Sequence, residues 1–269
     1  MIVDRENCEE IANVGEAKHT DHVRLFGIPI RPVTMSEAVQ EIDTAIVTRR
    51  NVQIGVVNAA KIVNMHRDPG LRESVMNSDV IYADGMAVVW ASRLLGKALP
   101  ERVAGIDLMH SLMRLAHRKR YRVFCLGAKQ PIVEEVVRVF QREYPEAEVV
   151  GARNGYFTEN EEQSVAEEVR EAGADILFVA ITSPKKERFM ARWGEHMGVP
   201  IVHGVGGSFD VVAGLVKRAP TSWQKNGFEW LYRVLQEPRR LIRRYLVTNS
   251  MFLWLVLREK FQPRRLPSR

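Results

Sequence analysis

The chain has 269 residues, of which 46% are hydrophobic and 27% are charged, and its formal net charge is +6 at pH 7. This composition is that of an ordinary globular protein and excludes an intrinsically disordered chain. The two cysteines, Cys8 and Cys125, make neither a disulfide framework nor a zinc site, which is typical of a reducing compartment. The first 22 residues are mostly polar and lack the apolar core of a secretory signal. We therefore expect a loose N-terminal tail over residues 1–22 and a cytoplasmic protein.

Apolar runs alternate with amphipathic stretches from residue 23 to residue 216. We expect strands over residues 23–30, 52–57, 79–83, 121–127, 147–151, 175–181 and 200–205. Several of these runs are continuous in Val, Ile and Leu, which indicates burial on both faces of a parallel sheet. The alternation predicts an α/β fold in which a doubly wound, mainly parallel, Rossmann-like sheet forms a core over residues 23–216.

The pattern changes after Gly214, where we predict no further strand. Residues 217–269 hold thirteen Lys or Arg against three Glu, while the rest of the chain sums to a charge of −4. We expect a C-terminal helical appendage over this segment, with two helices separated near Pro238, because proline ends or kinks a helix. A charge asymmetry of this kind points to an anionic partner.

The appendage contains the apolar run YLVTNSMFLWLVL, which has arginines on both sides. Its thirteen residues are too few to cross a bilayer, which takes about twenty. The pattern favours a helix that lies in a membrane interface, with its apolar side among lipid chains and its basic side on anionic lipid phosphates. The alternative is a helix pair that docks on the core or in an oligomer interface and leaves its arginines in solvent.

Two polar residues follow predicted strands directly. Asn58 comes after the strand at 52–57, and Asp84 comes after the strand at 79–83. In a parallel sheet both would lie at the carboxyl edge, where open α/β sheets bind ligands. Asp84 either caps the next helix through its side chain or acts as a general base, and the presence of Asn58 favours the second role.

Glycine-rich turns occur at Gly127 and at Gly206 and Gly207, each between a predicted strand and a predicted helix. Their backbone N–H groups could hold a diphosphate, although glycines at such turns equally serve close packing. Neither turn has the G-x-G-x-x-G spacing of a dinucleotide site, and no P-loop sequence is present. This argues against both NAD and P-loop nucleotide binding.

Several charged residues lie near predicted helix starts. Lys186 is unexpected there because a cation opposes the helix dipole, so we expect a compensating anion such as Glu187 or a bound phosphate. Asp107 suits a helix cap, whereas Arg102 has no evident partner nearby. The histidines show no H-E-x-x-H spacing and the chain has no D-x-D motif, so we expect chemistry without a metal or another cofactor.

Short blocks of the chain resemble the WecG/TagA/CpsF family of bacterial glycosyltransferases. They lie in order from about residue 24 to residue 250 and read NAAKI, YADGMAVVWASRLLG, ERVAGIDLM, CLGAK, PKKE, GVGGSFDVVAG, KRAP, GFEWLYRVLQEPRR and RRYL. The resemblance implies transfer of a sugar from a UDP-sugar to an undecaprenyl-diphosphate-linked sugar, without a metal, at the cytoplasmic face of the membrane. It also implies an α/β core whose C-terminal appendage reaches the membrane and lends arginines to the active site.

The resemblance also implies roles for individual residues, and it places the general base at Asp84. Together with the turn patterns, it predicts donor contacts in the core and in the appendage. They are Asn58, Arg102, Asp107, Gly127, Lys186, Gly206 and Gly207 in the core, and Arg233, Arg240 and Arg243 in the appendage.

The chain departs from the family pattern at two positions. Val56 stands where the family has a threonine, and Lys186 stands where it has a glutamine. Both changes alter polar groups near the sugar, so the donor stays open among N-acetylmannosamine, its uronate, glucose and similar sugars. A lysine there favours an acidic sugar or a contact with a phosphate.

The expected partners are a UDP-sugar donor, a polyprenyl-diphosphate-sugar acceptor, an anionic membrane surface and further copies of the chain in a homo-oligomer, but not nucleic acid. Two other functions compete. One is another nucleotide-using α/β enzyme, such as an epimerase or dehydrogenase, against which the missing G-x-G-x-x-G counts. The other is nucleic-acid binding through the basic tail, although its interleaved Trp, Phe and Leu suit a membrane interface better. We therefore predict a peripheral protein on the inner face of the cell membrane.

Overall fold

The computed structural model describes residues 22–261, except for the side chains of Lys225 and Arg240. The predicted tail, apart from its last residue, lies outside the described residues, as does Cys8. Cys125 is buried with a free thiol, in keeping with its apolar run.

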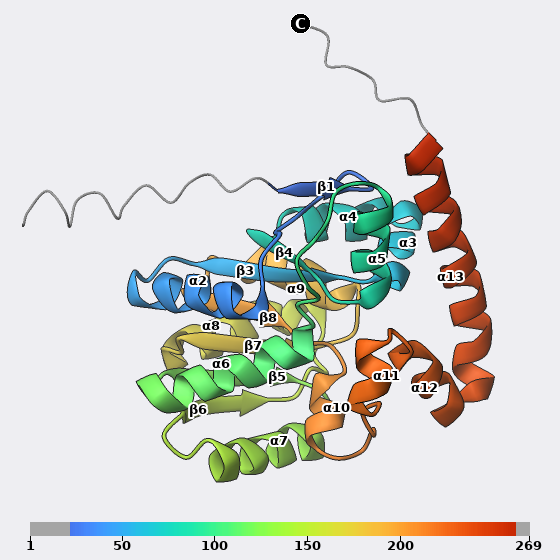
Figure 1. Ribbon diagram of the computed structural model, residues 1–269. Helices are drawn as coiled ribbons and strands as arrows, with labels where there is room; N and C mark the ends of the chain where they lie inside the picture. The colour runs from blue at the N-terminus through green and yellow to red at the C-terminus, as the bar shows by residue number, and fades with distance from the viewer. Residues whose placement is uncertain (1–21, 262–269) are drawn as a thin grey trace, which may run out of the picture.

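A six-stranded parallel sheet forms the centre of the molecule (Figure 1). Its order is β4–β3–β8–β7–β5–β6, and every neighbouring pair runs parallel. The strands are β3 Val52–Val57, β4 Val80–Ala83, β5 Arg122–Gly127, β6 Glu148–Arg153, β7 Ile176–Ala180 and β8 Ile201–Gly204. The predicted α/β fold with a parallel sheet is confirmed, and each of these strands begins and ends within two residues of its expected bounds.

The first expected strand, over residues 23–30, is wrong as a single strand. The structure forms an antiparallel hairpin there, with β1 at Val23–Leu25 and β2 at Ile28–Ile30. The turn residues Phe26 and Gly27 both have positive φ, at 55° and 74°. This is the backbone that a two-residue hairpin turn requires. The apolar Phe26 concealed the turn within a continuous apolar run.

Helices cover both faces of the sheet (Figure 1). Strand residues alternate between the faces, so that Val123 and Cys125 pack on one side and Phe124 and Leu126 on the other. The first side is covered by α2 Met35–Val47, α6 Gly105–Lys119 and α7 Gln130–Glu143. The second side is covered by α8 Glu162–Ala172 and α9 Lys185–Trp193, with the 3-10 turn η1 Glu159–Glu161 before α8.

A third apolar cluster lies at the β4 end of the sheet. It joins the hairpin to α3 Ala59–Arg67, α4 Pro69–Met76 and α5 Met86–Leu94. The short helix α10 Ser208–Val212 follows β8 at the carboxyl edge. The chain runs from β4 to β5 across the sheet, so the order reverses beside β3 and β8. A crevice at such a reversal is where open α/β sheets bind ligands.

The C-terminal segment is helical, but its described residues form three helices where two were expected: α11 Thr221–Lys225, α12 Glu229–Gln236 and α13 Pro238–Phe261. The expected break near Pro238 is confirmed, because this proline opens α13, where its missing N–H costs no hydrogen bond. One side of α13 docks on the core through Phe252, Leu255 and Val256, all buried in the third cluster. The Phe252 ring centroid lies 5.5 Å from that of Phe26 in the hairpin turn.

The other side of α13 faces solvent and is strongly apolar. Its exposed large side chains are Ile242, Leu246, Val247, Leu253, Trp254, Leu257 and Phe261. Figure 1 shows this helix running along one side of the molecule. Within residues 22–261 no helix has the length and apolar character needed to cross a membrane. The docked alternative therefore describes one face of α13, and the outer face is left uncovered.

Candidate active site

A cavity of about 330 Å³ lies at the carboxyl edge of β3, β4 and β8. Its floor comes from the strand ends and from the starts of α3, α5 and α6, and α12 and α13 close one side. Cavities of this size hold small-molecule ligands, typically in 300–1,000 Å³. Of the predicted site residues, those lining it are Asn58, Asp84, Arg102, Lys186, Gly206, Gly207 and Arg233.

Asn58 and Asp84 lie side by side, as expected from the parallel sheet. Residues Val57 and Ala83 are in register, and the Asp84 N–H donates to the Val57 carbonyl at 2.8 Å. Asn58 caps α3, because its Oδ1 accepts from the Lys61 N–H at 3.0 Å. This satisfies one of the free amides at the helix start.

Asp84 does not cap the helix that follows it. The N-cap of α5 is Gly85, which has no side chain, so the start of α5 has no side-chain cap in the described structure. Asp84 Oδ1 instead accepts from the N–H of Gly105, the first residue of α6, at 3.0 Å. One carboxylate oxygen is thus held by a backbone amide from a distant part of the chain, at the wall of the cavity.

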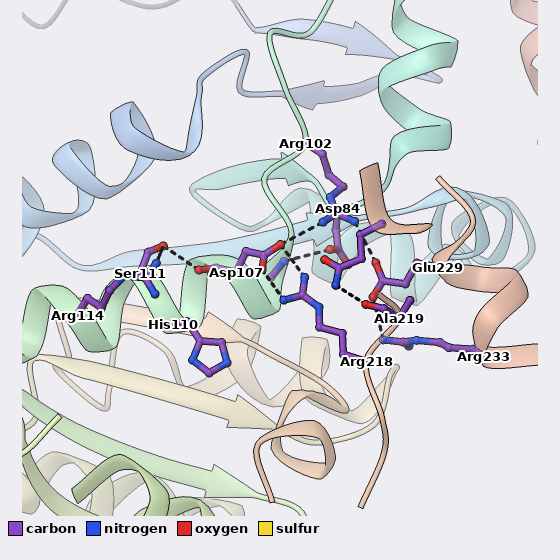
Figure 2. A network of polar contacts seen from close by, with 12 residues as sticks. Asp84, Arg102, Asp107, His110, Ser111, Arg114, Arg218, Ala219, Glu229 and Arg233 are labelled. Atoms are coloured by element: carbon purple, nitrogen blue, oxygen red, sulfur yellow. Dashed lines mark hydrogen bonds and ion pairs between the residues drawn. The ribbon is translucent and has the colours of Figure 1, made fainter. Parts of the chain in front are cut away.

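A network of arginines and carboxylates borders the cavity (Figure 2). Arg102 Nη2 lies 3.1 Å from Asp107 Oδ2, and Arg102 Nη1 lies 3.0 Å from Glu229 Oε2. Arg218 contacts both oxygens of Asp107, at 2.6 and 2.8 Å. Arg233 Nη2 lies 3.7 Å from Glu229 Oε1, one turn away on α12. Arg102 therefore joins the core to the start of α12, and Asp107 is an ion-pair partner and not a helix cap.

A second charged cluster lies at the cavity wall, where Lys61 and Lys186 are lining residues. Lys61 Nζ lies 2.9 Å from Glu187 Oε1, and Lys186 Nζ lies 3.4 Å from the same oxygen. The side chains of Lys186 and Glu187 are each only 7% exposed. The expected anion beside Lys186 is therefore Glu187, which is shared with Lys61. Because two lysines share one glutamate, the cluster has a net positive charge at the cavity wall.

The two glycine-rich turns have different positions. Gly206 and Gly207 line the cavity, and a side chain at the preceding Gly204 would press against Lys186, at 2.9 Å from its Cε. Gly127 does not line the cavity among the described residues, because β7 separates β5 from β8. Its φ of +136° and a Cβ approach of 2.4 Å to the Ala180 backbone make it a packing glycine.

The sequence matches a family model described as the WecG/TagA/CpsF family of glycosyl transferases over residues 23–266. The chain belongs to this family. The match spans the whole sheet, the cavity and α13, so the predicted resemblance is confirmed. The protein is therefore a glycosyltransferase, an enzyme with a sugar donor and an acceptor, and the epimerase and dehydrogenase alternatives are not retained.

Electrostatics set the state of Asp84 in this glycosyltransferase. Burial raises the pKa of Asp84 above its usual value, and the negative charge of Glu229 raises it further. The Gly105 amide, Arg102 and Lys61 act in the opposite direction. The net effect is a carboxyl group with a raised pKa, which makes it a stronger base than an exposed aspartate once ionised.

The buried lysine pair has its own pKa shifts. Burial, with the charge of Lys61, lowers the pKa of Lys186 to about 8. Burial raises the pKa of Glu187, but the charges of Lys186 and Lys61 outweigh this effect and bring the pKa to about 2. Glu187 is therefore ionised at neutral pH, and it supports a charged Lys186 at the cavity wall.

The predicted arginines of the C-terminal appendage do not all reach the cavity of this glycosyltransferase. Arg233 lines the cavity, whereas Arg243 is exposed and is not among the described lining residues. The side chain of Arg240 lies outside the described part of the chain. Arg244, which was not predicted, lines the cavity beside Tyr245 and Asn249 of α13. The sequence held a signal for two of these residues: Tyr245 and Asn249 are four residues apart, so they lie on one face of a helix that begins at Pro238.

Other contributors also escaped the sequence analysis. They are Lys61, His203, Arg218 and Glu229. His203 is fully buried in β8, with Nε2 at 3.0 Å from the Gly105 carbonyl oxygen, and burial lowers its pKa to about 4. It is therefore a neutral support beneath the turn that holds Asp84. Within residues 22–261, no three His, Cys, Asp or Glu side chains gather as a metal site would require.

Proposed function

We propose that the protein transfers a hexose-type sugar from a UDP-sugar to a polyprenyl-diphosphate-linked sugar, with Asp84 as the general base. The observation that carries this proposal is the placement of Asp84 at the wall of a cavity that Arg102, Lys186 and Arg233 also line. Asp84 is held by a backbone amide and not by an arginine, and it shares the cavity with several cations, as proton removal beside a departing diphosphate requires.

In the proposed reaction, an acceptor hydroxyl oxygen attacks the anomeric carbon of the donor. A new glycosidic bond forms, the bond from that carbon to the diphosphate oxygen breaks, and the hydroxyl proton passes to the free carboxylate oxygen of Asp84. The Gly105 amide holds the other oxygen in place. The raised pKa of Asp84 brings its proton affinity closer to working pH, which improves a general base.

Negative charge develops on the departing UDP. Arg102, Arg233, Arg244 and Lys186 all line the cavity. Guanidinium groups bind phosphate oxygens in pairs, and a buried lysine contributes a point charge. We propose that these side chains and the amides at Gly206 and Gly207 neutralise the diphosphate without a metal. Val56 also lines the cavity, so Val56 and Lys186 are the positions at which donor choice is set.

We further propose that the protein works at the inner surface of the cell membrane. The outer face of α13 exposes Leu253, Trp254 and Leu257, and Arg258 lies beside Trp254 with its guanidinium carbon 5.3 Å from the ring centroid. Apolar and basic side chains together suit an anionic lipid interface. Away from lipid, a second copy would cover this face, which gives the homo-oligomer that we expect. Nucleic-acid binding is the competing use of the basic segment.

The experiment that tests the reaction is a screen of UDP-sugars against a polyprenyl-diphosphate-sugar acceptor, with release of UDP as the readout. Donors should include UDP-glucose, a UDP-N-acetylhexosamine and a UDP-uronate. We expect turnover with one donor class in the presence of acceptor and only slow hydrolysis without it. Absence of transfer from every donor, with UDP binding also absent, would overturn the proposal.

A further inference from the structure

Glu229 occupies an unusual place in the cavity wall. It is the first residue of α12, and its side chain is 21% exposed. Its Oε2 accepts from Arg102 at 3.0 Å, and its Oε1 lies 3.7 Å from Arg233 (Figure 2). One carboxylate thus spans an arginine of the core and an arginine of the appendage, both of which line the cavity.

The other carboxylates nearby are held in different ways. Asp107 is held by both terminal nitrogens of Arg218, so it does not depend on Arg102. Asp84 is held by the Gly105 amide. Glu229 is held by the same two arginines that the proposed function gives to the donor diphosphate. Its charge also acts on Asp84, which shows that both carboxylates share one electrostatic environment.

Carboxylate and phosphate groups compete for guanidinium donors because both accept paired hydrogen bonds in the same plane. A diphosphate and Glu229 cannot share Arg102 and Arg233 without strong repulsion between their negative charges. We infer that Glu229 is an internal substitute for the donor diphosphate: its carboxylate holds Arg102 and Arg233 in the empty site and leaves them when the donor binds. This inference rests on the proposed function.

Two consequences follow for binding. The donor must break the contact between Glu229 and Arg102, so Glu229 lowers the affinity for any ligand with a diphosphate. It has no such effect on the nucleoside portion. The contact also joins α12 to the core, so diphosphate binding releases one of the ties that hold the start of α12 against the loop before α6.

The test is calorimetric titration of the full chain with UDP, UMP and uridine. In Glu229→Gln, which keeps the shape and removes the charge, we expect the Kd for UDP to fall about fivefold, in line with loss of a partly exposed ion pair. Uridine affinity should not change, and UMP should show a smaller gain than UDP. Glu195→Gln, an exposed charge removal before β8 at the amino edge of the sheet, is the matched control and should leave all three affinities unchanged.

A second variant and a second background keep the test decisive. Glu229→Asp keeps the charge but shortens the arm, so it should bind UDP more tightly than wild type, and this comparison holds even if the glutamine variant does not fold. Where both variants fold, the gain for Glu229→Asp should be the smaller one. In an Arg102→Ala background, Glu229→Gln should change UDP affinity much less. Weaker or unchanged UDP binding in both Glu229 variants, or an equal gain for uridine, would overturn the inference. Failure of wild type to bind UDP at all would instead overturn the proposed function and the inference with it.

Discussion

Asp84 derives its environment from three separate parts of the chain. Its own strand places it at the sheet edge, α6 supplies the amide of Gly105, and α12 supplies the negative charge of Glu229. Burial and Glu229 both favour the protonated form, whereas Arg102 and Lys61 favour the charged form. The balance leaves Asp84 with a raised pKa at the point where the proposed acceptor hydroxyl must lose its proton.

Replacement of Asp84 by asparagine should therefore separate turnover from stability. Asparagine can still accept from the Gly105 amide but cannot take a proton, so turnover should fall about a hundredfold or more, while UDP affinity stays nearly constant. Because the folded-state pKa is raised, ionised Asp84 costs stability above that pKa, and the neutral asparagine removes this cost. The melting temperature at neutral pH should not fall. Unchanged turnover would return Asp84 to a purely structural role.

The pH profile gives an independent measurement at the same residue. The base must be ionised, so turnover should fall as the pH drops through the raised pKa of Asp84. Glu229→Gln removes a negative charge that raises this pKa, so the acid limb should move to lower pH. Glu195→Gln should leave the acid limb where it is. A limb that is identical in all three proteins would show that Asp84 does not control the acid side of the profile.

Among the secondary-structure elements, α13 both packs on the core and presents an exposed apolar face, and its sequence does not show which residues belong to which face. Phe252, Leu255 and Val256 lie in the core, whereas Leu253 and Trp254 face solvent. The apolar run is continuous, so its composition alone could not show which residues dock. Near its first turns the same helix supplies Arg244, Tyr245 and Asn249 to the cavity.

Adjacent residues on α13 offer a matched pair of variants. Phe252 is 7% exposed and Leu253 is 58% exposed. We expect Phe252→Ala to lower the free energy of unfolding by about 3 kcal/mol or more, and to lower turnover because the docked helix positions part of the cavity wall. Leu253→Ala should change stability by about 0.5 kcal/mol or less. Denaturant unfolding of both variants checks this, and equal losses would contradict the docked arrangement.

The sequence predicted the elements better than it predicted their contacts. Buried parallel strands are readable as Val, Ile and Leu runs, and the parallel sheet brought Asn58 and Asp84 together as expected. The expectation that Arg102 has no partner nearby was wrong, because Asp107 lies 3.1 Å from it. Its second partner was not readable, because Glu229 lies 127 residues away and pairs only in the folded chain. Gly127 carries the same local pattern as the cavity glycines, and only the strand order separates it from them.

At the scale of the whole molecule, charge and apolar surface coincide on the appendage. The segment from residue 217 onward carries all of the excess basic charge, because the rest of the chain is net negative, and α13 exposes a row of large apolar side chains. On α5, Trp90 and Leu94 are also half-exposed, and the Gly227 backbone packs against the Trp90 ring. The cavity wall includes residues from both α5 and α13, so these apolar surfaces lie on the elements that border the site.

This arrangement predicts how the protein responds to lipid. Vesicles that contain anionic lipid should carry the full chain in flotation, and raised salt should weaken the binding, because the arginines act through a screened field. Replacement of Leu253, Trp254 and Leu257 by serine should abolish flotation while preserving turnover on a short-chain, water-soluble acceptor.

Val47→Ser is the control, because Val47 is exposed on α2, which covers a face of the sheet. It should float as the wild type does. Undiminished flotation of the triple variant would show that another surface binds the lipid. Binding to DNA in a shift assay, without flotation, would favour the nucleic-acid alternative.

The path of α13 also bears on when the enzyme becomes active during its synthesis. Glu259, near the end of this helix, accepts from the Phe26 N–H at 2.6 Å and pairs with Lys97 at 2.9 Å, so the last described turn is fastened to the first hairpin. The sheet with Asp84 can form while the ribosome still holds the appendage, but the wall that contains Arg244 and Asn249 cannot. We therefore expect a nascent chain to have the sheet edge before it has the complete cavity wall.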